Sequence, residues 1–247
     1  RAVKTAMAHP TGPVFISLPV DVLNAERELD LLASTRVAPR IRGDAAAIEA
    51  AADLLVRARR PLLVAGDAIS QGDALAEMAE EAELLGAPVY GECVPSTCSF
   101  PFTHPLYAGP FPRLGPPIRN LLMGHDVLFS VGGDLFTLSL PSDVEPMPEG
   151  LTVVHMDTDP WQLGKNYPAK VAILGDPKAT LPDLAEALRK RLSPAVLKER
   201  AGKVAELTAA HAAATEKMRA KARAEVQTSP ISPLALVGAV AEAGPDH

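Results

Sequence analysis

The chain has 247 residues, of which 47% are hydrophobic and 22% are charged. This length and composition are typical of a folded protein of one or two domains and exclude a disordered chain. The 24 Lys and Arg residues against 30 Asp and Glu residues give a net charge of −6. An acidic chain argues against nucleic acid and anionic membranes as partners. Two cysteines, and no apolar run of about 18 residues, favour a cytoplasmic protein without a membrane span.

The first 43 residues combine a short apolar run with a charged stretch. Residues 1–9 are predicted to end an amphipathic helix, and Gly12-Pro13 breaks it. The run Val14-Phe15-Ile16-Ser17-Leu18-Pro19-Val20 predicts a buried strand. Residues 25–43 are charged and contain Pro39 and Gly43, so we interpret them as a linker.

Residues 44–192 alternate between helical patterns and short apolar runs. Strands are predicted at 62–65, 88–90, 126–131, 151–156 and 171–174, and helices at 44–60, 73–85, 118–123 and 176–192. Residues 93–117 are rich in Pro and Gly and are predicted as a loop. The strands are apolar throughout, as expected when helices cover both faces of a parallel sheet. The sequence therefore predicts an α/β fold with a doubly wound, Rossmann-like parallel sheet.

The C-terminal residues have a different composition. Residues 193–228 are rich in Ala, Lys, Arg and Glu, which predicts a solvent-facing helical connector. Pro230 and Pro233 end this pattern, and a new helix begins within 229–247. The chain starts without Met and stops directly after a helical pattern, so we expect it to be part of a longer protein.

Glycine and aspartate residues follow several predicted strands. Ligands of open α/β sheets bind beyond the carboxyl ends of the strands, where glycine permits close approach and carboxylates can hold ribose hydroxyls. The alternative is that these residues serve only as turns and helix caps, because no dinucleotide fingerprint or phosphate-binding loop motif is present. The candidate nucleotide-binding residues are Gly66, Asp67, Gly132, Gly133, Asp157, Asp159, Gly175 and Asp176.

Other candidate sites lack partners. Cys93, Cys98 and His104 lie close in sequence, but zinc needs a fourth ligand, so loop packing is favoured and no metal site is predicted. His155 lies in a predicted buried strand and is interpreted as a core residue. Ser17 and Ser139 have no visible His and acid partners for a hydrolase triad.

Several segments, taken together in order, resemble the thiamine-diphosphate-dependent enzymes. They are Gly12–Asp21, Arg60–Gly66, Phe100–Pro105 with Gly109, Gly124–Leu128, His155–Pro160 with Gly164–Asn166, and Ile173–Asp176. The central loop most resembles benzoylformate decarboxylase, and Asp157–Asn166 is equally similar to acetolactate synthase. The resemblance implies that residues 1–24 end a pyrimidine-binding domain, 25–43 form a linker and 44–192 form the central domain. Residues 193–228 would then be the connector, and 229–247 would start a pyrophosphate-binding domain.

The resemblance also implies what lies outside this chain. The activating glutamate would precede Arg1, and the motif that binds Mg²⁺ and thiamine diphosphate would follow His247. Neither Gly66-Asp67-Ala68 nor Gly133-Asp134-Leu135 matches that motif. We therefore expect this chain alone to bind no thiamine diphosphate and to catalyse nothing, with its missing domains as intramolecular partners and a homodimer or homotetramer as the assembly.

The sequence is compatible with three functions. The first is the central part of a thiamine-diphosphate- and Mg²⁺-dependent 2-oxo acid decarboxylase, with Leu138 and Ser139 lining the active-site mouth. Ser139 aligns with a catalytic histidine of benzoylformate decarboxylases, and because serine cannot relay protons as histidine can, the substrate or the protonation step would differ. The second is an acetolactate-synthase-like carboligase that holds FAD, or ADP, in the central cleft. The third is a stand-alone nucleotide-binding or interaction domain.

Overall fold

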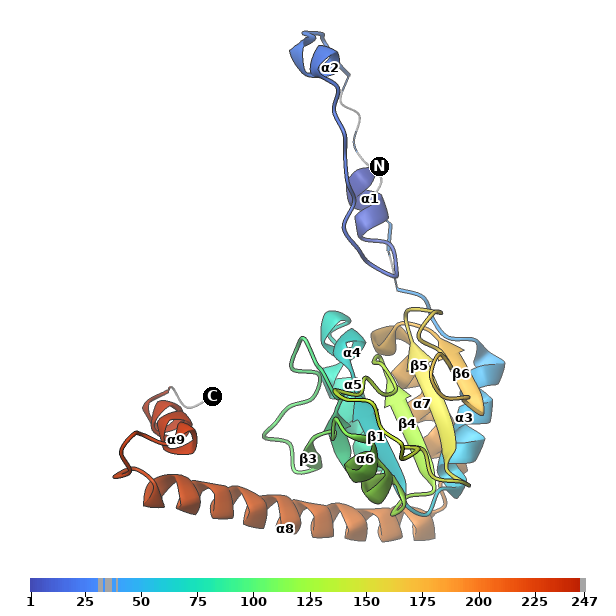
Figure 1. The fold of residues 1–247 in the computed structure, drawn as a ribbon. Helices are drawn as coiled ribbons and strands as arrows, with labels where there is room; N and C mark the ends of the chain where they lie inside the picture. Colours follow the sequence, from blue (N-terminus) through green and yellow to red (C-terminus); the bar gives the residue numbers. More distant parts are fainter. Residues whose placement is uncertain (31–32, 34–36, 39, 245–247) are drawn as a thin grey trace.

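The computed structural model describes residues 1–30, 33, 37–38 and 40–244. Its centre is a six-stranded sheet in the order β3-β2-β1-β4-β5-β6, with every neighbouring pair parallel (Figure 1). The prediction of an α/β fold with a parallel sheet is confirmed. The strands are β1 (Pro61–Ala65), β2 (Val89–Gly91), β3 (Tyr107–Pro110), β4 (Val127–Val131), β5 (Thr152–Asp157) and β6 (Val171–Leu174).

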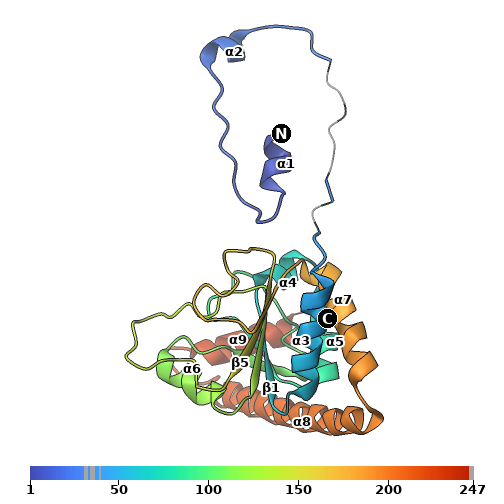
Figure 2. The ribbon, with the colours of Figure 1, turned by 90° about the vertical axis from the view of Figure 1, so that its right-hand side faces the viewer.

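Helices cover both faces of the sheet, as Figure 2 shows with the sheet nearly edge-on. On one face, α3 (Ala45–Arg57), α5 (Leu75–Leu85) and α7 (Pro177–Arg191) bury a large apolar cluster. On the other face, α6 (Gly115–Leu122) packs on a smaller cluster. Side chains of β4 alternate between the two clusters, with Phe129 in the first and Leu128 in the second. Burial on both sides explains why these strands are apolar at every position.

The helix ends follow the signals in the sequence. The Asp44 carboxylate accepts a hydrogen bond from the Ala47 backbone N–H at 3.1 Å, and Asp176 accepts one from Ala179 at 3.0 Å. These side chains cap α3 and α7 as predicted. Gly86 ends α5 with φ of +59°, a left-handed conformation that favours glycine.

The N-terminal segment departs from the prediction. Residues 14–20 form no strand; instead, the short helices α1 (Ala2–Ala6) and α2 (Val20–Asn24) flank an extended stretch in which Phe15 is 91% exposed. The strand prediction is wrong here because a strand needs a neighbouring strand and a buried face, and the described residues supply this segment with neither. The predicted linker at 25–43 lies partly outside the described residues, and its described part contains no helix or strand.

Two short elements were missed. Strand β3 lies within the predicted loop 93–117, where Tyr107-Ala108-Gly109-Pro110 carries no strand pattern, and its pairing with β2 at the sheet edge supplies what the pattern lacks. Helix α4 (Asp67–Gln71) follows β1 directly and lies ahead of the predicted helix at 73–85. Helix α6 also begins earlier than predicted, at Gly115.

The long helix α8 (Pro194–Ala224) occupies most of the predicted connector and runs beneath the sheet domain, ahead of α9 (Pro233–Ala243) (Figure 1). The prediction of a solvent-facing helix needs one correction, because Arg200 is only 3% exposed. Its guanidinium donates hydrogen bonds to the carbonyls of Leu84, Leu55 and Val56 at 3.0, 3.0 and 3.1 Å. These carbonyls lie at the C-terminal ends of α5 and α3, where a cation is stabilised.

In the part of the chain that the structure describes, no helix combines the length and apolar character that a membrane crossing requires.

Candidate binding cleft

A cavity of about 340 Å³ opens at the carboxyl ends of β1, β2, β4 and β5. This is the edge at which ligands of parallel α/β sheets bind. Five of the eight residues predicted to bind a nucleotide line this cavity: Asp67, Gly132, Gly133, Asp157 and Asp159. The lining also includes His9, Pro10, Thr11, Glu92, Asp134, Thr137 and Gln162.

The glycines bring the ends of β1 and β4 into direct contact. The Gly66 N–H donates to the Val131 carbonyl at 2.8 Å, and the Ala68 N–H donates to the Gly132 carbonyl at 3.0 Å. A Cβ atom on Gly66 would lie 2.4 Å from the Gly133 Cα, so no larger residue fits there without movement. Gly132 has φ of +72°, which only glycine adopts readily. The turns after β1 and β4 therefore pack closely together and form the floor of the cavity.

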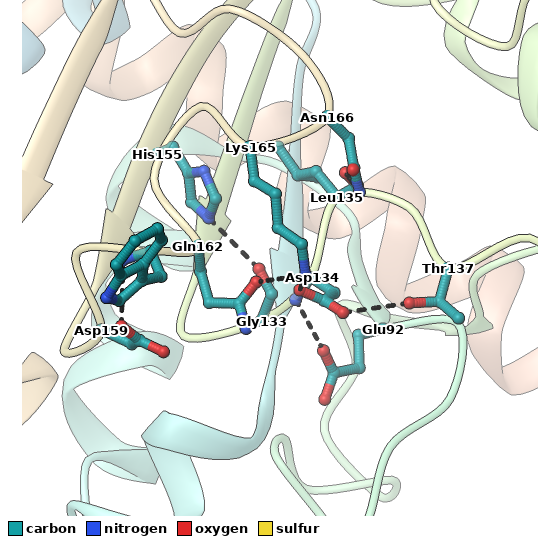
Figure 3. Close-up of polar contacts among 11 residues, drawn as sticks. Glu92, Gly133, Asp134, Leu135, Thr137, His155, Asp159, Gln162, Lys165 and Asn166 are labelled. Atoms are coloured by element: carbon teal, nitrogen blue, oxygen red, sulfur yellow. Dashed lines mark hydrogen bonds and ion pairs between the residues drawn. The ribbon is translucent and has the colours of Figure 1, made fainter. Parts of the chain in front are cut away.

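Glu92 lies against this floor, and Figure 3 shows its carboxylate bonded to the Asp134 backbone. Its Oε1 accepts a hydrogen bond from the Asp67 backbone N–H, and its Oε2 accepts one from the Asp134 backbone N–H, both at 3.2 Å. The side chain is 6% exposed. Burial first, and the negative charge of Asp67 second, raise the pKa of Glu92 to about 7, although the two amide hydrogen bonds oppose this.

The Asp67 carboxylate binds the loop that follows β2, at Ser96 and Thr97. It accepts hydrogen bonds from the backbone N–H groups of Ser96 and Thr97, each at 2.9 Å, and from the Thr97 hydroxyl at 2.7 Å. Partial burial would raise the pKa of Asp67, but these hydrogen bonds outweigh it and lower the pKa. Asp67 thus stays ionised and much of its acceptor capacity is used by the protein.

Asp157 and Asp159 form the cavity wall at the end of β5. The Asp159 N–H donates to Asp157 Oδ1 at 2.8 Å, and the Trp161 N–H donates to Asp159 Oδ1 at 2.9 Å. Burial raises the pKa of Asp157 to about 6, partly offset by the hydrogen bond from Asp159. Both carboxylates line the cavity and can accept hydrogen bonds from the hydroxyls of a ligand.

Asp134 and His155 hold the turn after β4 from both sides (Figure 3). The Thr137 hydroxyl donates to Asp134 Oδ2 at 3.1 Å, and Lys165 Nζ lies 3.8 Å from Asp134 Oδ1. His155 Nε2 lies 3.2 Å from the Gly133 carbonyl, so this nitrogen carries the hydrogen. His155 is buried, as predicted, and burial lowers its pKa. Its Nδ1 has no hydrogen-bond partner among the described residues.

Gly175 and Asp176 do not line this cavity. Asp176 caps α7, and its backbone N–H donates to the Ile41 carbonyl at 2.7 Å. A Cβ atom on Gly175 would lie 2.6 Å from Thr180 Oγ1, so this glycine serves packing. For these two residues the contacts support the alternative interpretation, in which they serve as a turn and a helix cap.

Leu138 and Ser139 also lie outside the cavity lining. Leu138 packs against the smaller apolar cluster, and Ser139 is exposed, with its N–H donating to the Arg113 carbonyl at 3.0 Å. They occupy the loop after β4.

The residues considered for zinc have separate partners. Cys93 Sγ donates to the Pro112 carbonyl and Cys98 Sγ to the Phe100 carbonyl, each at 3.2 Å, while His104 Nε2 lies 3.4 Å from Glu83. Within the described ranges, no three His, Cys, Asp or Glu residues are arranged to hold a metal ion. These contacts support loop packing.

The sequence reasoning missed Glu92, although a signal was present. Glu92 directly follows β2, so the strand-end rule that selected Asp67 and Asp157 also applies to it. Lys165 and Asn166 were missed as supporting residues because their loop is distant in sequence from Asp134 and Leu135, to which they bind.

The cleft is polar and acidic. Five carboxylates line it, and no Lys or Arg does so among the described residues. It can accept hydrogen bonds from a ligand that carries several hydroxyl groups. It does not fit a diphosphate with its Mg²⁺, because its described lining offers neither cations for the phosphates nor a metal-ligand cluster.

The sequence model of the family "Thiamine pyrophosphate enzyme, central domain" matches residues 48–184. Benzoylformate decarboxylase of Pseudomonas aeruginosa is 30% identical over 196 residues, which cover 78% of this chain and 37% of that protein. The acetolactate synthase large subunit of Corynebacterium glutamicum is 30% identical over 193 residues, covering 75% of this chain and 30% of that protein.

Among solved structures, benzoylformate decarboxylase from Polynucleobacter necessarius superimposes with a TM-score of 0.67 at 28% identity. The superposition covers 75% of this chain and 34% of that chain. The chain thus spans about a third of the length of these relatives. Because the family model covers more than half of the chain and its extent coincides with the helices and strands around the cleft, the chain belongs to the thiamine pyrophosphate enzymes and contains their central domain.

Proposed function

We propose that this chain is the central part of a thiamine-diphosphate- and Mg²⁺-dependent enzyme that acts on a small 2-oxo acid, with a decarboxylase of the benzoylformate type as the first candidate. The match of the central-domain model to residues 48–184 carries this proposal. The cofactor supplies the electron sink for loss of CO₂, and the protein orients and shields it.

Within such an enzyme, the described residues have a supporting role. The acidic cleft does not fit the diphosphate and metal, so no step of the reaction is assigned to its residues. We propose that the cofactor binds to other domains of the same polypeptide and that the assembled enzyme is a cytoplasmic homodimer or homotetramer. Leu138 and Ser139, in the exposed loop after β4, remain candidates for the mouth of that active site.

The test is a comparison of this chain with the whole polypeptide that contains it. With thiamine diphosphate and Mg²⁺ present, the whole polypeptide should release CO₂ from at least one member of a panel of 2-oxo acids. This chain alone should release none and should bind no thiamine diphosphate by calorimetry. A whole polypeptide that neither binds the cofactor nor turns over any panel member would overturn the proposal.

A second candidate function rests on the cleft. Asp157 and Asp159 lie side by side at the end of β5, on the cavity wall, which favours recognition of ribose hydroxyls. We therefore propose that the cleft binds the nucleoside portion of a nucleotide, as in an acetolactate-synthase-like carboligase that holds FAD or ADP. This property would equally suit a stand-alone nucleotide-binding domain.

Thermal unfolding with adenosine, ADP or FAD tests this second candidate. A rise in Tm that saturates with ligand, and that is lost in Asp159→Asn, supports a nucleoside site. Asp143→Asn is the matched control, since Asp143 is exposed and lies outside the cavity lining. No rise with any of the three ligands would remove the nucleotide-binding functions and leave the decarboxylase proposal intact.

A further inference from the structure

The carboxylate of Glu92 accepts hydrogen bonds from two backbone amides at the floor of the cleft, in the way that a bound anion would. The amides belong to Asp67 and Asp134, in the turns after β1 and β4, and each donates to a different oxygen of the same carboxylate at 3.2 Å. Backbone N–H groups that converge from turns form a concave site for anions. In this fold the site is occupied by a side chain from a third strand end, after β2.

The geometry around Glu92 shows that the space is shaped for this carboxylate. A Cβ atom on Gly133 would lie 2.2 Å from Glu92 Oε2, so the glycine leaves the space that the carboxylate fills. The carboxylate lies against the cavity that the ligand would enter. A second anion cannot share the two amides, because both are already bonded to Glu92.

The charged groups around Glu92 are mostly negative. Titratable groups on the cavity lining or in contact with it are Asp67, Asp134, Asp157, Asp159, Cys93, His9, His155 and Lys165. Lys165 is held by Asp134 at 3.8 Å, and the carboxylates outnumber it. A phosphate group brought to this floor would meet net negative charge in a partly dehydrated place, which is unfavourable.

We propose that Glu92 is a specificity-determining residue of the cleft: its carboxylate occupies the position between the Asp67 and Asp134 amides where a ligand phosphate would bind. The cleft therefore selects ligands that present hydroxyl groups to its floor and rejects ligands that present a phosphate there. The part of this inference that concerns the natural ligand of the cleft rests on the proposed nucleoside site. The occupation of the two amides is testable without that ligand.

The first experiment uses sulfate as the probe, because its charge is constant between pH 6 and pH 8. The backbone amide resonances of Asp67 and Asp134 are followed by NMR during a sulfate titration of the full chain. We expect saturable shifts of both amides in Glu92→Ala, with an affinity at least tenfold above that of the unaltered chain. Glu149→Gln, which removes the same charge outside the cleft, should behave like the unaltered chain.

Lowering the pH from 8 to 6 provides an internal check. The pKa of Glu92 lies near 7, so acidification neutralises the carboxylate and should strengthen sulfate binding to the unaltered chain. Glu92→Ala should show a smaller change, arising from the other carboxylates. If Glu92→Ala does not fold by circular dichroism, Glu92→Gln replaces it, because the amide keeps the size and can accept only one of the two hydrogen bonds.

The second experiment compares adenosine with AMP. The unaltered chain should bind AMP no more tightly than adenosine, and Glu92→Ala should bind AMP at least fivefold more tightly while its adenosine affinity changes less than twofold. If neither chain binds adenosine, the nucleoside site is wrong, and the sulfate titration alone decides the role of Glu92. Equal sulfate shifts with and without Glu92, or none in either, would overturn the inference.

Discussion

The Gly133 Cα lies 2.4 Å from the position that a Cβ atom would take on Gly66. The turns after β1 and β4 thus pack backbone against backbone, and together they form the cleft floor. Gly66 has φ of −110°, which any residue can adopt, so the requirement for glycine is steric and not conformational.

We therefore predict that Gly66→Ala destabilises the fold by about 1–3 kcal/mol, because the added methyl group displaces backbone and not a flexible side chain. Urea unfolding measures the loss. Gly202→Ala is the control, since nothing lies within 4 Å of its Cβ position inside α8. That change should be neutral or stabilise the chain by up to ~1 kcal/mol. Equal effects of the two changes would contradict the steric explanation.

Glu81 is a second buried carboxylate, on α5 within the packed face of the domain. It is fully buried, and neither oxygen has a hydrogen-bond partner among the described residues. Burial raises its pKa well above the ordinary 4.5, so Glu81 keeps its proton to a higher pH in the folded chain than in the unfolded chain. Because the unfolded chain ionises this group first, its contribution to stability decreases as pH rises above about 4.5.

Glu81→Met should stabilise the chain by about 1–3 kcal/mol at pH 8, since it removes a buried polar group without partners. The gain should shrink toward pH 5, where the unfolded chain ionises Glu81 less. Urea unfolding of both chains at the two pH values measures this difference. A gain that is the same at pH 5 and pH 8 would show that Glu81 has an ordinary pKa in the folded state.

Arg200 joins α8 to the ends of α3 and α5 through three carbonyl groups. Arg200→Ala should cost about 2–3 kcal/mol, because the buried carbonyls lose their charged donor. Arg200→Lys should recover only part of this, since an ammonium group lacks the planar fork of guanidinium. Hydrogen exchange should increase along the first half of α8. Arg219→Ala, on an exposed part of the same helix, should leave exchange unchanged there.

His155 supports the cleft floor through the Gly133 carbonyl. Burial lowers its pKa, so the imidazole stays neutral in the folded chain, and its contribution to stability is lost as pH falls below about 6.5. Long-range ¹H–¹⁵N spectra should show the hydrogen on Nε2, and the pKa of this ring should lie below the ordinary 6.5. A signal that titrates near pH 6.5 would contradict the burial of His155 in solution.

Much of the fold was predictable because it depends on local chemistry. Asp44 and Asp176 as caps and Gly86 as a helix end act through neighbours in the chain. The apolar runs at 127–131 and 152–156 match strands because both of their faces are buried. The residues 14–20 have the same apolar character, but a strand also requires a partner strand, which the described residues do not provide. Strand β3 is the converse case, since its pairing with β2 defines it.

The sequence by itself determined the fold class, the helix ends and the family resemblance that the central-domain match bears out. It also pointed to the glycines and aspartates at the strand ends. Only the tertiary structure separated Asp157 and Asp159, which line the cleft, from Asp176, which caps a helix. It alone brought Glu92 onto the amides of Asp67 and Asp134. The physical reason is that caps and periodic patterns act within a few residues, whereas a binding cleft depends on which strand ends meet in space.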